Sequence, residues 1–351
     1  MLCLSLLALG TVSEPQAVPE RTLPAVGAEF PEGFTRIASI RELRDGRVLV
    51  VDERDATVRL LDFTRGTMSD VGRQGGGPGE YRSPSRLLPM PGDSTLLTDI
   101  RQQRSIVIGP DGKAGDLLLS GTALADAPSQ ARAPLALDPR GRLYFQQLSI
   151  DPNDPTTLPD SAWLVRWSPT TRKSDTVGRV KIPWRDIQIQ RENGKVSKVA
   201  VFTVPLMPQD DWTMLRDGRI AVIRTGDYHL ELIGPDGAIT RGARIPYTPI
   251  EITAAERRQG PLWEKSPKLK PPFDGPSILA APDDRLWIKR TTVFGDSTAR
   301  YDVLDLGGRL VARVALPART RLAGFGAASL YVVRRDLDDV EYLGRLVQPK
   351  L

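Results

Sequence analysis

Arginine is the residue type in this sequence whose placement could do chemistry. Arg224, Arg290 and Arg334 each stand four residues after the first apolar residue of a repeated unit, and Arg54 and Arg101 stand near the matching points of two other units. A guanidinium group presents a planar fork of N–H donors that fits a carboxylate or a phosphate through two parallel hydrogen bonds. If the fold brings these side chains together, we expect a binding site for an anionic ligand.

The alternative is an ordinary charged rim. Asp52, Asp99 and Asp227 lie near the same points of the repeat and could neutralise the arginines. The chain has 48 Lys and Arg residues against 43 Asp and Glu residues, a formal net charge of +5, and the two signs are interspersed. There is no basic tail or polybasic block of the kind that binds nucleic acid through charge alone.

Other catalytic or metal chemistry has few residues to use. His229 is the only histidine and lies in an alternating run that predicts a β-strand, and no serine elbow accompanies it. The acidic loops that contain Asp151, Asn153 and Asp154, and Asp336 to Glu341, lack the spacing of a calcium loop and consist of ordinary turn residues. We therefore expect no metal site, no cofactor and no catalytic residue; we favour a non-catalytic protein and leave activity open.

A repeated unit must position any such site. Each unit has a Gly- or Asp-bearing turn, a short β-type run, a polar tip and a second run, and the first runs begin at Val48, Leu96, Leu143, Ile220, Leu286 and Leu330. The short intervals, of 44 to 48 residues, match one four-stranded propeller blade. The two long intervals contain a predicted hairpin at Ile187–Val196, with an Asn193-Gly194 turn, and a predicted short helix within Ile252–Lys265.

These units predict an all-β protein, a six-bladed β-propeller of four-stranded antiparallel blades. The last unit lacks a strand, so we expect a strand within Ala28–Ile40 to complete the ring, since an open edge would promote aggregation. Crossovers between blades and the tips between each second and third strand should share one face, where we expect ligands to bind. These tips are Glu53 to Thr57, Gln102 to Gln103, Ile150 to Asp160, Thr225 to Asp227, Phe294 to Thr298 and Asp336 to Asp339.

The densest local signal is the loop from Gly72 to Tyr81. Gly75, Gly77, Pro78, Gly79 and Glu80 predict a tight backbone, and we interpret the loop as structural. With Pro84 after it, the loop resembles the inter-blade loop of the NHL-type and related (TolB-like) six-bladed β-propeller proteins, of the form G-R-x-G-x-G-P-G-E-[FY]. The run Gly46-Arg47-Val48-Leu49-Val50-Val51-Asp52 resembles the strand before that loop. The resemblance covers about Ile40 to Leu97 and implies the propeller fold.

The start of the chain predicts export. Met1 to Gly10 form an apolar run that ends in Ala8-Leu9-Gly10, a pattern like a signal-peptide cleavage site in a leader that looks truncated. Ten residues cannot span a bilayer as a helix, so we expect no transmembrane helix. Removal of the leader removes Cys3, the only cysteine, and with it any disulfide. We predict a periplasmic or secreted monomer, with residues 1–24 as export remnant and extended lead-in and residues 25–351 as a single propeller domain.

Three functions compete on this fold. The first is an exported, non-catalytic propeller that binds a ligand or a partner protein on the loop face. The second is a metal-dependent hydrolase or lyase like the calcium-dependent lactonase-type propellers, for which carboxylates exist without an ordering motif. The third is RNA binding like that of NHL-type propellers; export argues against it, so we expect no nucleic-acid partner.

Overall fold

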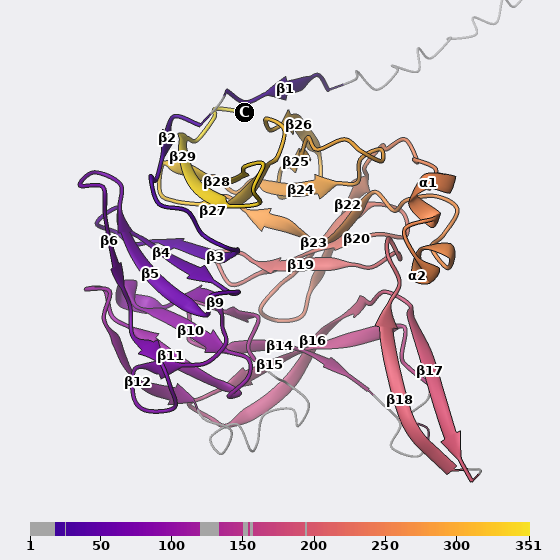
Figure 1. Cartoon of the computed structure of the whole chain (residues 1–351), viewed down its shortest axis with the longest axis horizontal. Coiled ribbons are helices and arrows are strands. Elements are labelled where there is room, and N and C mark those ends of the chain that lie inside the picture. The colour runs from indigo at the N-terminus through magenta and orange to yellow at the C-terminus, as the bar shows by residue number, and fades with distance from the viewer. Residues whose placement is uncertain (1–17, 25, 120–132, 150–153, 155–156, 194) are drawn as a thin grey trace, which may run out of the picture.

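Six antiparallel sheets form the blades of a ring, which confirms the predicted six-bladed β-propeller (Figure 1). The computed structural model describes residues 18–24, 26–119, 133–149, 154, 157–193 and 195–351. The leader with Cys3 lies outside this part of the chain. In each repeated unit, the first apolar run forms the second strand of a blade. Its apolar residues are buried on both faces, between the two neighbouring blades.

The first three blades take up residues 37–181. Blade 1 has β3 (Ile37–Glu42), β4 (Val48–Asp52), β5 (Thr57–Asp62) and β6 (Thr67–Asp70); blade 2 has β9 (Pro84–Pro89), β10 (Thr95–Asp99), β11 (Arg104–Ile108) and β12 (Ala114–Leu119); blade 3 has β13 (Ala136–Leu137), β14 (Leu143–Leu148), β15 (Ser161–Ser168) and β16 (Lys173–Lys181).

The last three blades follow two insertions and include the N-terminal strands. Blade 4 has β19 (Asp211–Met214), β20 (Ile220–Arg224), β21 (His229–Ile233) and β22 (Ile239–Arg244); blade 5 has β23 (Phe273–Ala280), β24 (Leu286–Arg290), β25 (Arg300–Leu304), β26 (Leu310–Ala315) and β1 (Glu20–Thr22); blade 6 has β27 (Thr320–Phe325), β28 (Ser329–Arg335), β29 (Glu341–Val347) and β2 (Ala28–Glu29).

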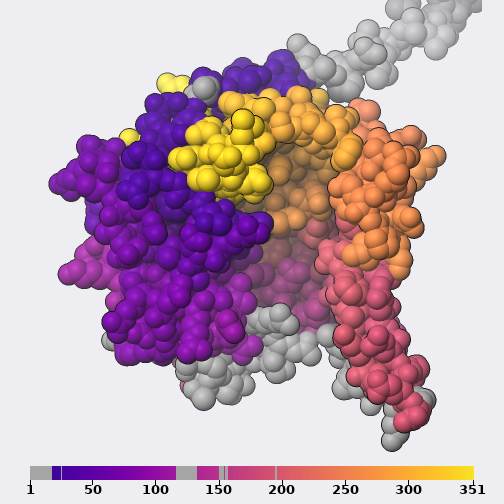
Figure 2. All heavy atoms as spheres, viewed as in Figure 1, coloured from indigo at the N-terminus to yellow at the C-terminus, as the bar shows by residue number. Residues whose placement is uncertain are grey.

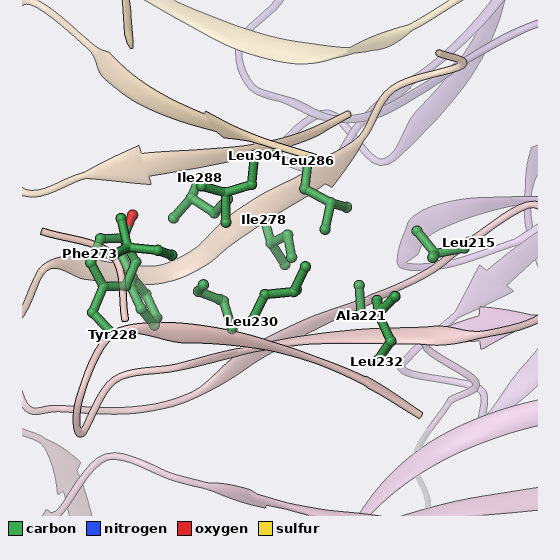
Figure 3. Close-up of a cluster of buried hydrophobic side chains, with 12 residues drawn as sticks. Leu215, Ala221, Tyr228, Leu230, Leu232, Phe273, Ile278, Leu286, Ile288 and Leu304 are labelled. Atoms are coloured by element: carbon green, nitrogen blue, oxygen red, sulfur yellow. The ribbon is translucent and has the colours of Figure 1, made fainter. Parts of the chain in front are cut away.

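The core lies between the blades. In the described residues the buried apolar side chains form six clusters, one for each pair of neighbouring blades. Figure 3 shows the cluster between blades 4 and 5, where Leu230 and Tyr228 face Ile278, Ile288 and Phe273. A blade therefore buries its apolar faces only when it has a neighbour on each side, which makes the closed ring the smallest complete unit.

The ring closes through the N-terminal segment, as predicted. β2 pairs antiparallel with β29, with Ala28 opposite Arg345, and Phe30 and Phe34 are buried in the cluster between blades 6 and 1. The closing strand is Ala28–Glu29 alone, because Ile37 and the residues after it form β3, the first strand of blade 1.

A second N-terminal strand lies within the range that the sequence treats as a lead-in. β1 pairs in parallel with β26, with Arg21 opposite Val314, at the outer edge of blade 5. The outer strand of a blade leaves a row of backbone groups unpaired, and an extended, proline-bounded segment can cover them. Residues 20–22 are thus part of a blade, whereas a separate domain beginning at residue 25 stays a prediction.

Both predicted insertions are present. The hairpin consists of β17 (Arg185–Glu192) and β18 (Lys195–Thr203), which pair only with each other and project from the ring (Figure 1); Gly194 of its turn lies outside the described residues. The second insertion has two short helices instead of one, α1 (Ala254–Arg257) and α2 (Pro261–Glu264), because the chain leaves helical geometry at Gly260. No helix in the described ranges is both long and apolar enough to cross a membrane.

The glycine loop is held by hydrogen bonds within the protein. It contains two short strands that pair in parallel, β7 (Arg73–Gln74) and β8 (Glu80–Tyr81). Glu80 accepts a hydrogen bond from the Gly77 backbone N–H at 2.7 Å, and the buried Arg104 donates to the carbonyl of Gly76 at 2.9 Å. Gly72 and Gly79 have positive φ angles of 70° and 68°. These contacts support the structural interpretation of the loop.

The first prediction concerns closure. A variant that begins at Pro31 lacks β1, β2 and Phe30, and it should aggregate or melt at a temperature lower by more than about 5 °C, because two blade edges and one core cluster are opened. Thermal unfolding with light scattering measures this, and a variant that begins at Val18 is the control. A monomeric Pro31 variant with an unchanged melting temperature would contradict closure by β2.

The second prediction concerns the loop. A Cβ atom at Gly72 would lie 2.4 Å from the carbonyl oxygen of Gly79, and the residue has a positive φ, so Gly72→Ala should cost about 1–3 kcal/mol of unfolding free energy. Gly76→Ala is the matched control, since its added Cβ would contact only the end of the Arg82 side chain at 3.8 Å. Chemical denaturation of both variants gives the difference, and equal losses would refute the argument.

Candidate functional site

A pocket of about 360 Å³ opens on the predicted loop face, between blades 5 and 6. Its walls are the end of β24, the tip that follows it, the crossover into blade 6, the start of β27 and the tip between β28 and β29. The lining residues are Lys289, Arg290, Thr292, Asp296, Ser297, Thr298, Ala299, Arg319, Thr320, Arg321, Val333, Arg335, Asp339 and Glu341. Two of the tips expected to bind ligands, Phe294 to Thr298 and Asp336 to Asp339, therefore contribute to it.

The pocket has more cations than anions. Five of its lining residues are Lys or Arg and three are Asp or Glu. Hydroxyl groups of Thr292, Ser297, Thr298 and Thr320 supply further hydrogen-bonding groups, and no aromatic side chain lines the pocket. This chemistry suits a small, polar, negatively charged ligand better than an apolar one.

The carboxylates of the pocket are already engaged by the protein. Glu341 accepts the Ile37 backbone N–H at 2.7 Å and forms ion pairs with Arg321 at 3.0 Å and Arg335 at 3.4 Å. Asp339 is shared by Arg319 at 3.5 Å and Arg335 at 3.7 Å. Because Arg335 pairs with both carboxylates, two carboxylates serve three guanidinium groups, which leaves one positive charge uncompensated among them.

Asp296, the third carboxylate, is engaged by Thr298, which also lines the pocket, and by Arg300. Its pKa lies below the ordinary value because the Thr298 backbone N–H donates to it, with further help from Arg300. Arg300 does not line the pocket, and it pairs with Asp296 at 3.4 Å. Asp296 is therefore held in its ionised form, and its charge is shared with Arg300, which lies outside the pocket lining.

Lys289 has no ion-pair partner within the described part of the chain. Its side chain is exposed to solvent. Partial desolvation and the nearby charge of Arg321 lower the pKa of its ammonium group, while Asp274 opposes the shift. An anion bound in the pocket would supply the missing countercharge. Lys289 is accordingly the residue on which ligand binding should depend most.

The three equivalent arginines do not share partners. Arg290 lines the pocket and has weak contacts to Glu20 at 3.8 Å and Asp302 at 3.7 Å. Arg224 pairs with two carboxylates of its own blade 4, Asp210 at 2.9 Å and Glu231 at 2.6 Å, and donates to the Arg179 carbonyl of blade 3 at 2.7 Å. The expected cluster of three unpaired guanidinium groups is not formed, because each group contacts carboxylates near its own blade.

Arg334 points away from the pocket. It forms two hydrogen bonds of 2.7 Å with Glu29 of β2 and lies over the ring of Tyr342. Its neighbour Arg335 lines the pocket, since successive side chains of a strand point to opposite faces. The sequence count therefore selected the wrong residue of this pair for the pocket.

Arg54 and Arg101 lie in the tips of blades 1 and 2, as expected from their positions, and neither lines the pocket. Ligand binding by these two residues stays a prediction. The sequence reasoning missed Lys289, Arg319 and Arg321. Arg319 could have been found by examining the crossovers between blades together with the tips, because both lie on one face.

The structure gives a separate account of the acidic groups and His229. The described residues contain no group of three or more His, Cys, Asp or Glu side chains placed to hold a metal ion; Asp151 and Asn153 lie outside them. His229 lies in β21, as predicted, and is buried between Asp227 at 2.5 Å and Glu231 at 3.1 Å. Asp52 and Asp99 are buried and accept backbone N–H groups of the adjoining loops, such as those of Thr35 and Arg82.

Comparison with known proteins supports the fold alone. No protein-family model matches the sequence, and no curated protein matches it. A solved structure of a DUF4221 family member from Bacteroides vulgatus is similar with a TM-score of 0.52 and 9% identity, over 92% of this chain and 97% of that one. A putative exported protein from Bacteroides fragilis has a TM-score of 0.52 and 12% identity, over 90% and 91%.

Virginiamycin B lyase from Staphylococcus aureus is similar at a lower TM-score of 0.40, with 13% identity over 90% of this chain and 86% of that one. That similarity is too low to support an argument about activity. The six-bladed β-propeller is therefore established by the sheets and by the two solved structures, and membership of an NHL-type family stays a prediction.

Proposed function

We propose that this protein is an exported, non-catalytic β-propeller that binds a small anionic ligand in the pocket between blades 5 and 6. Support comes from the five cations and three carboxylates of the pocket lining, and from the sharing of Asp339 and Glu341 between arginines. The leader sequence Met1 to Gly10 supports export.

The single observation that carries the proposal is Lys289. It lines the pocket, and no carboxylate of the described residues forms an ion pair with it. A cation kept among other cations raises the free energy of the unliganded protein, and a bound carboxylate, sulfate or phosphate removes that repulsion. Thr292 and Thr320 line the same pocket and bring hydroxyl groups to it.

The third prediction tests this pocket. Calorimetric titration with sulfate, phosphate and citrate should detect binding to the protein, and Lys289→Gln should weaken the tightest of them about tenfold, since a charged hydrogen bond contributes about 1.5–3 kcal/mol. Lys113→Gln is the control, because Lys113 lies on an exposed turn outside the pocket. Added salt should weaken binding to the parent.

Two outcomes would count against the proposal. The first is that none of the three anions binds, and the second is that Lys289→Gln and the parent bind them equally. Stabilisation of the folded protein by calcium alone would instead favour the lactonase-type alternative, because a ligand that binds only the folded state raises the melting temperature.

The fourth prediction uses the pKa of Lys289. Sulfate keeps its charge from neutral to alkaline pH, so any loss of affinity in that range must come from the protein. Because the pKa of Lys289 is lowered, the parent should lose sulfate affinity at a lower pH than an ordinary lysine would cause. In Lys289→Gln that step should be missing, and its persistence would assign it to another group.

A further inference from the structure

The hairpin β17–β18 carries an apolar stripe that no other part of the described chain covers. Cross-strand pairs place Ile187 beside Val201 and Ile189 beside Val199 on one face. Ile189 and Val199 are each 38% exposed and Val201 is 45% exposed, although β-branched apolar residues are usually buried. None of these residues belongs to one of the six core clusters.

The hairpin stands outside the ring with its backbone edges open. β17 and β18 form a sheet of two strands only, and the hairpin extends away from the blades in Figures 1 and 2. A two-stranded sheet is marginally stable in water, and an open edge can accept another strand. Its base is fixed by Lys265, which pairs with Asp186 at 2.6 Å and joins the hairpin to the helical insertion.

Positive charge flanks the apolar stripe. On β17, Arg185, Ile187, Ile189 and Arg191 alternate with polar residues and so share one face. Arg185 is half-buried, and its Nη2 atom is buried without a hydrogen-bond partner among the described residues, so a partner's carboxylate would have to reach the exposed part of the guanidinium group. Of the two hairpin carboxylates, Asp186 is occupied by Lys265. The face of β17 thus presents an arginine, two isoleucines and an arginine at alternate positions.

A second copy of the chain fits this edge poorly. Antiparallel pairing of β17 with itself about a twofold axis requires residues on the same face to lie opposite each other. The two registers that use the whole strand place Arg185 opposite Arg191, or Asp186 opposite Glu192. Like charges directly opposite each other destabilise a strand pair.

A lipid surface also fits poorly. The tip of the hairpin contains Arg191, Glu192 and Asn193, and Arg191 and Glu192 are exposed. A hairpin that enters a bilayer would have to insert these charged and polar groups first, and charged side chains within the bilayer are costly.

We propose that the free edge of β17 is a docking site for an extended segment of a partner protein, which adds as a third strand. The segment carries two acidic residues that flank two apolar residues at alternate positions, in the order acidic, apolar, apolar, acidic. The acidic side chains pair with Arg185 and Arg191, and the apolar ones cover Ile187 and Ile189. Main-chain hydrogen bonds to the open edge supply affinity, and the alternate side chains supply specificity.

A library of random dodecapeptides displayed on phage and selected on the immobilised parent protein tests the proposal. The enriched peptides should carry acidic residues six positions apart with apolar residues at the second and fourth positions between them. The best of these peptides is then synthesised, and the Ile189→Asp variant of the protein should bind it at least tenfold more weakly than the parent does. Ile239→Asp is the matched control, because Ile239 is a strand isoleucine that is 59% exposed and lies in β22.

A charge reversal makes the test specific. Selection on Arg191→Glu should replace the acidic residue at one end of the motif with a basic one, an outcome that a merely damaged hairpin would not give. Lys289→Gln should bind the peptide as the parent does, which separates this site from the pocket. Unchanged melting temperatures of the variants would show that the ring is intact.

Several results would overturn the proposal. These are enrichment of peptides without the acidic and apolar alternation, peptide binding that survives Ile189→Asp, and no enrichment at all. A parent that sediments as a dimer and becomes monomeric in Ile189→Asp would assign the edge to a second copy. Binding of the parent to phosphatidylserine vesicles that Ile189→Asp abolishes would assign it to a membrane.

Discussion

Contact between blade 6 and blade 1 is the constraint on which the other parts of this structure depend. Five of the six core clusters join blades that follow each other along the chain, whereas the sixth joins Phe30, Phe34 and Val50 to Tyr331 and Leu343. Tyr331 also donates a hydrogen bond of 2.6 Å to Glu42 across the same boundary. Because every blade buries its faces against two neighbours, loss of this junction exposes apolar surface on both sides of the break.

Closure also fixes the pocket. Glu341, which begins the last strand of blade 6, accepts the backbone N–H of Ile37 in blade 1 and binds Arg321 and Arg335. The same carboxylate therefore holds the junction and sets the charge of the cavity beside it. Binding of an anion there would be sensitive to the fit between blades 6 and 1, although Ile37 itself does not line the pocket.

Buried carboxylates hold the backbone of the tips in blades 1 and 2. Asp52 and Asp99 accept backbone N–H groups of their own tips and of the preceding crossovers. Asp211 accepts those of Ser277 and Ile278; burial raises its pKa, and these hydrogen bonds only partly oppose the shift. Such carboxylates are engaged before a ligand arrives. The pocket differs because Asp339 and Glu341 are each shared between two arginines, and no described carboxylate forms an ion pair with Lys289.

The fold could be predicted from local patterns. The apolar runs after Gly46 and Gly218 form the buried second strands of blades 1 and 4. A run of mainly β-branched residues can pack against a neighbouring blade on each face of the strand. The residue types of the glycine loop predict a tight backbone directly, and its structural role stays a prediction that the hydrogen bonds of Glu80 and Arg104 support. The closing strand could also be predicted, because the last unit of the sequence lacks one of its four strands.

The site could be predicted only in part, because counting along the chain does not fix side-chain direction. In blade 2 the candidate near the matching point was Arg101, whereas β10 begins at Thr95 and already ends at Asp99. In blade 6 the count selected Arg334 in place of Arg335. A shift of one residue moves a side chain to the other face of a strand. Lys289 and Arg321 meet through packing of two blades, which no local pattern contains.

The pairing of Ala28 with Arg345 also decides when folding can finish. Blades 1 to 4 consist of strands that follow each other along the chain, so they can form from local hairpins, whereas blades 5 and 6 each take one strand from the N-terminal segment. The last contact joins segments more than 300 residues apart, and it can form only after the intervening blades have curved the chain far enough to bring β2 beside β29. Chains rich in such distant contacts fold slowly. Until the first segment docks, a nearly complete propeller remains an open arc with an exposed edge at blade 6.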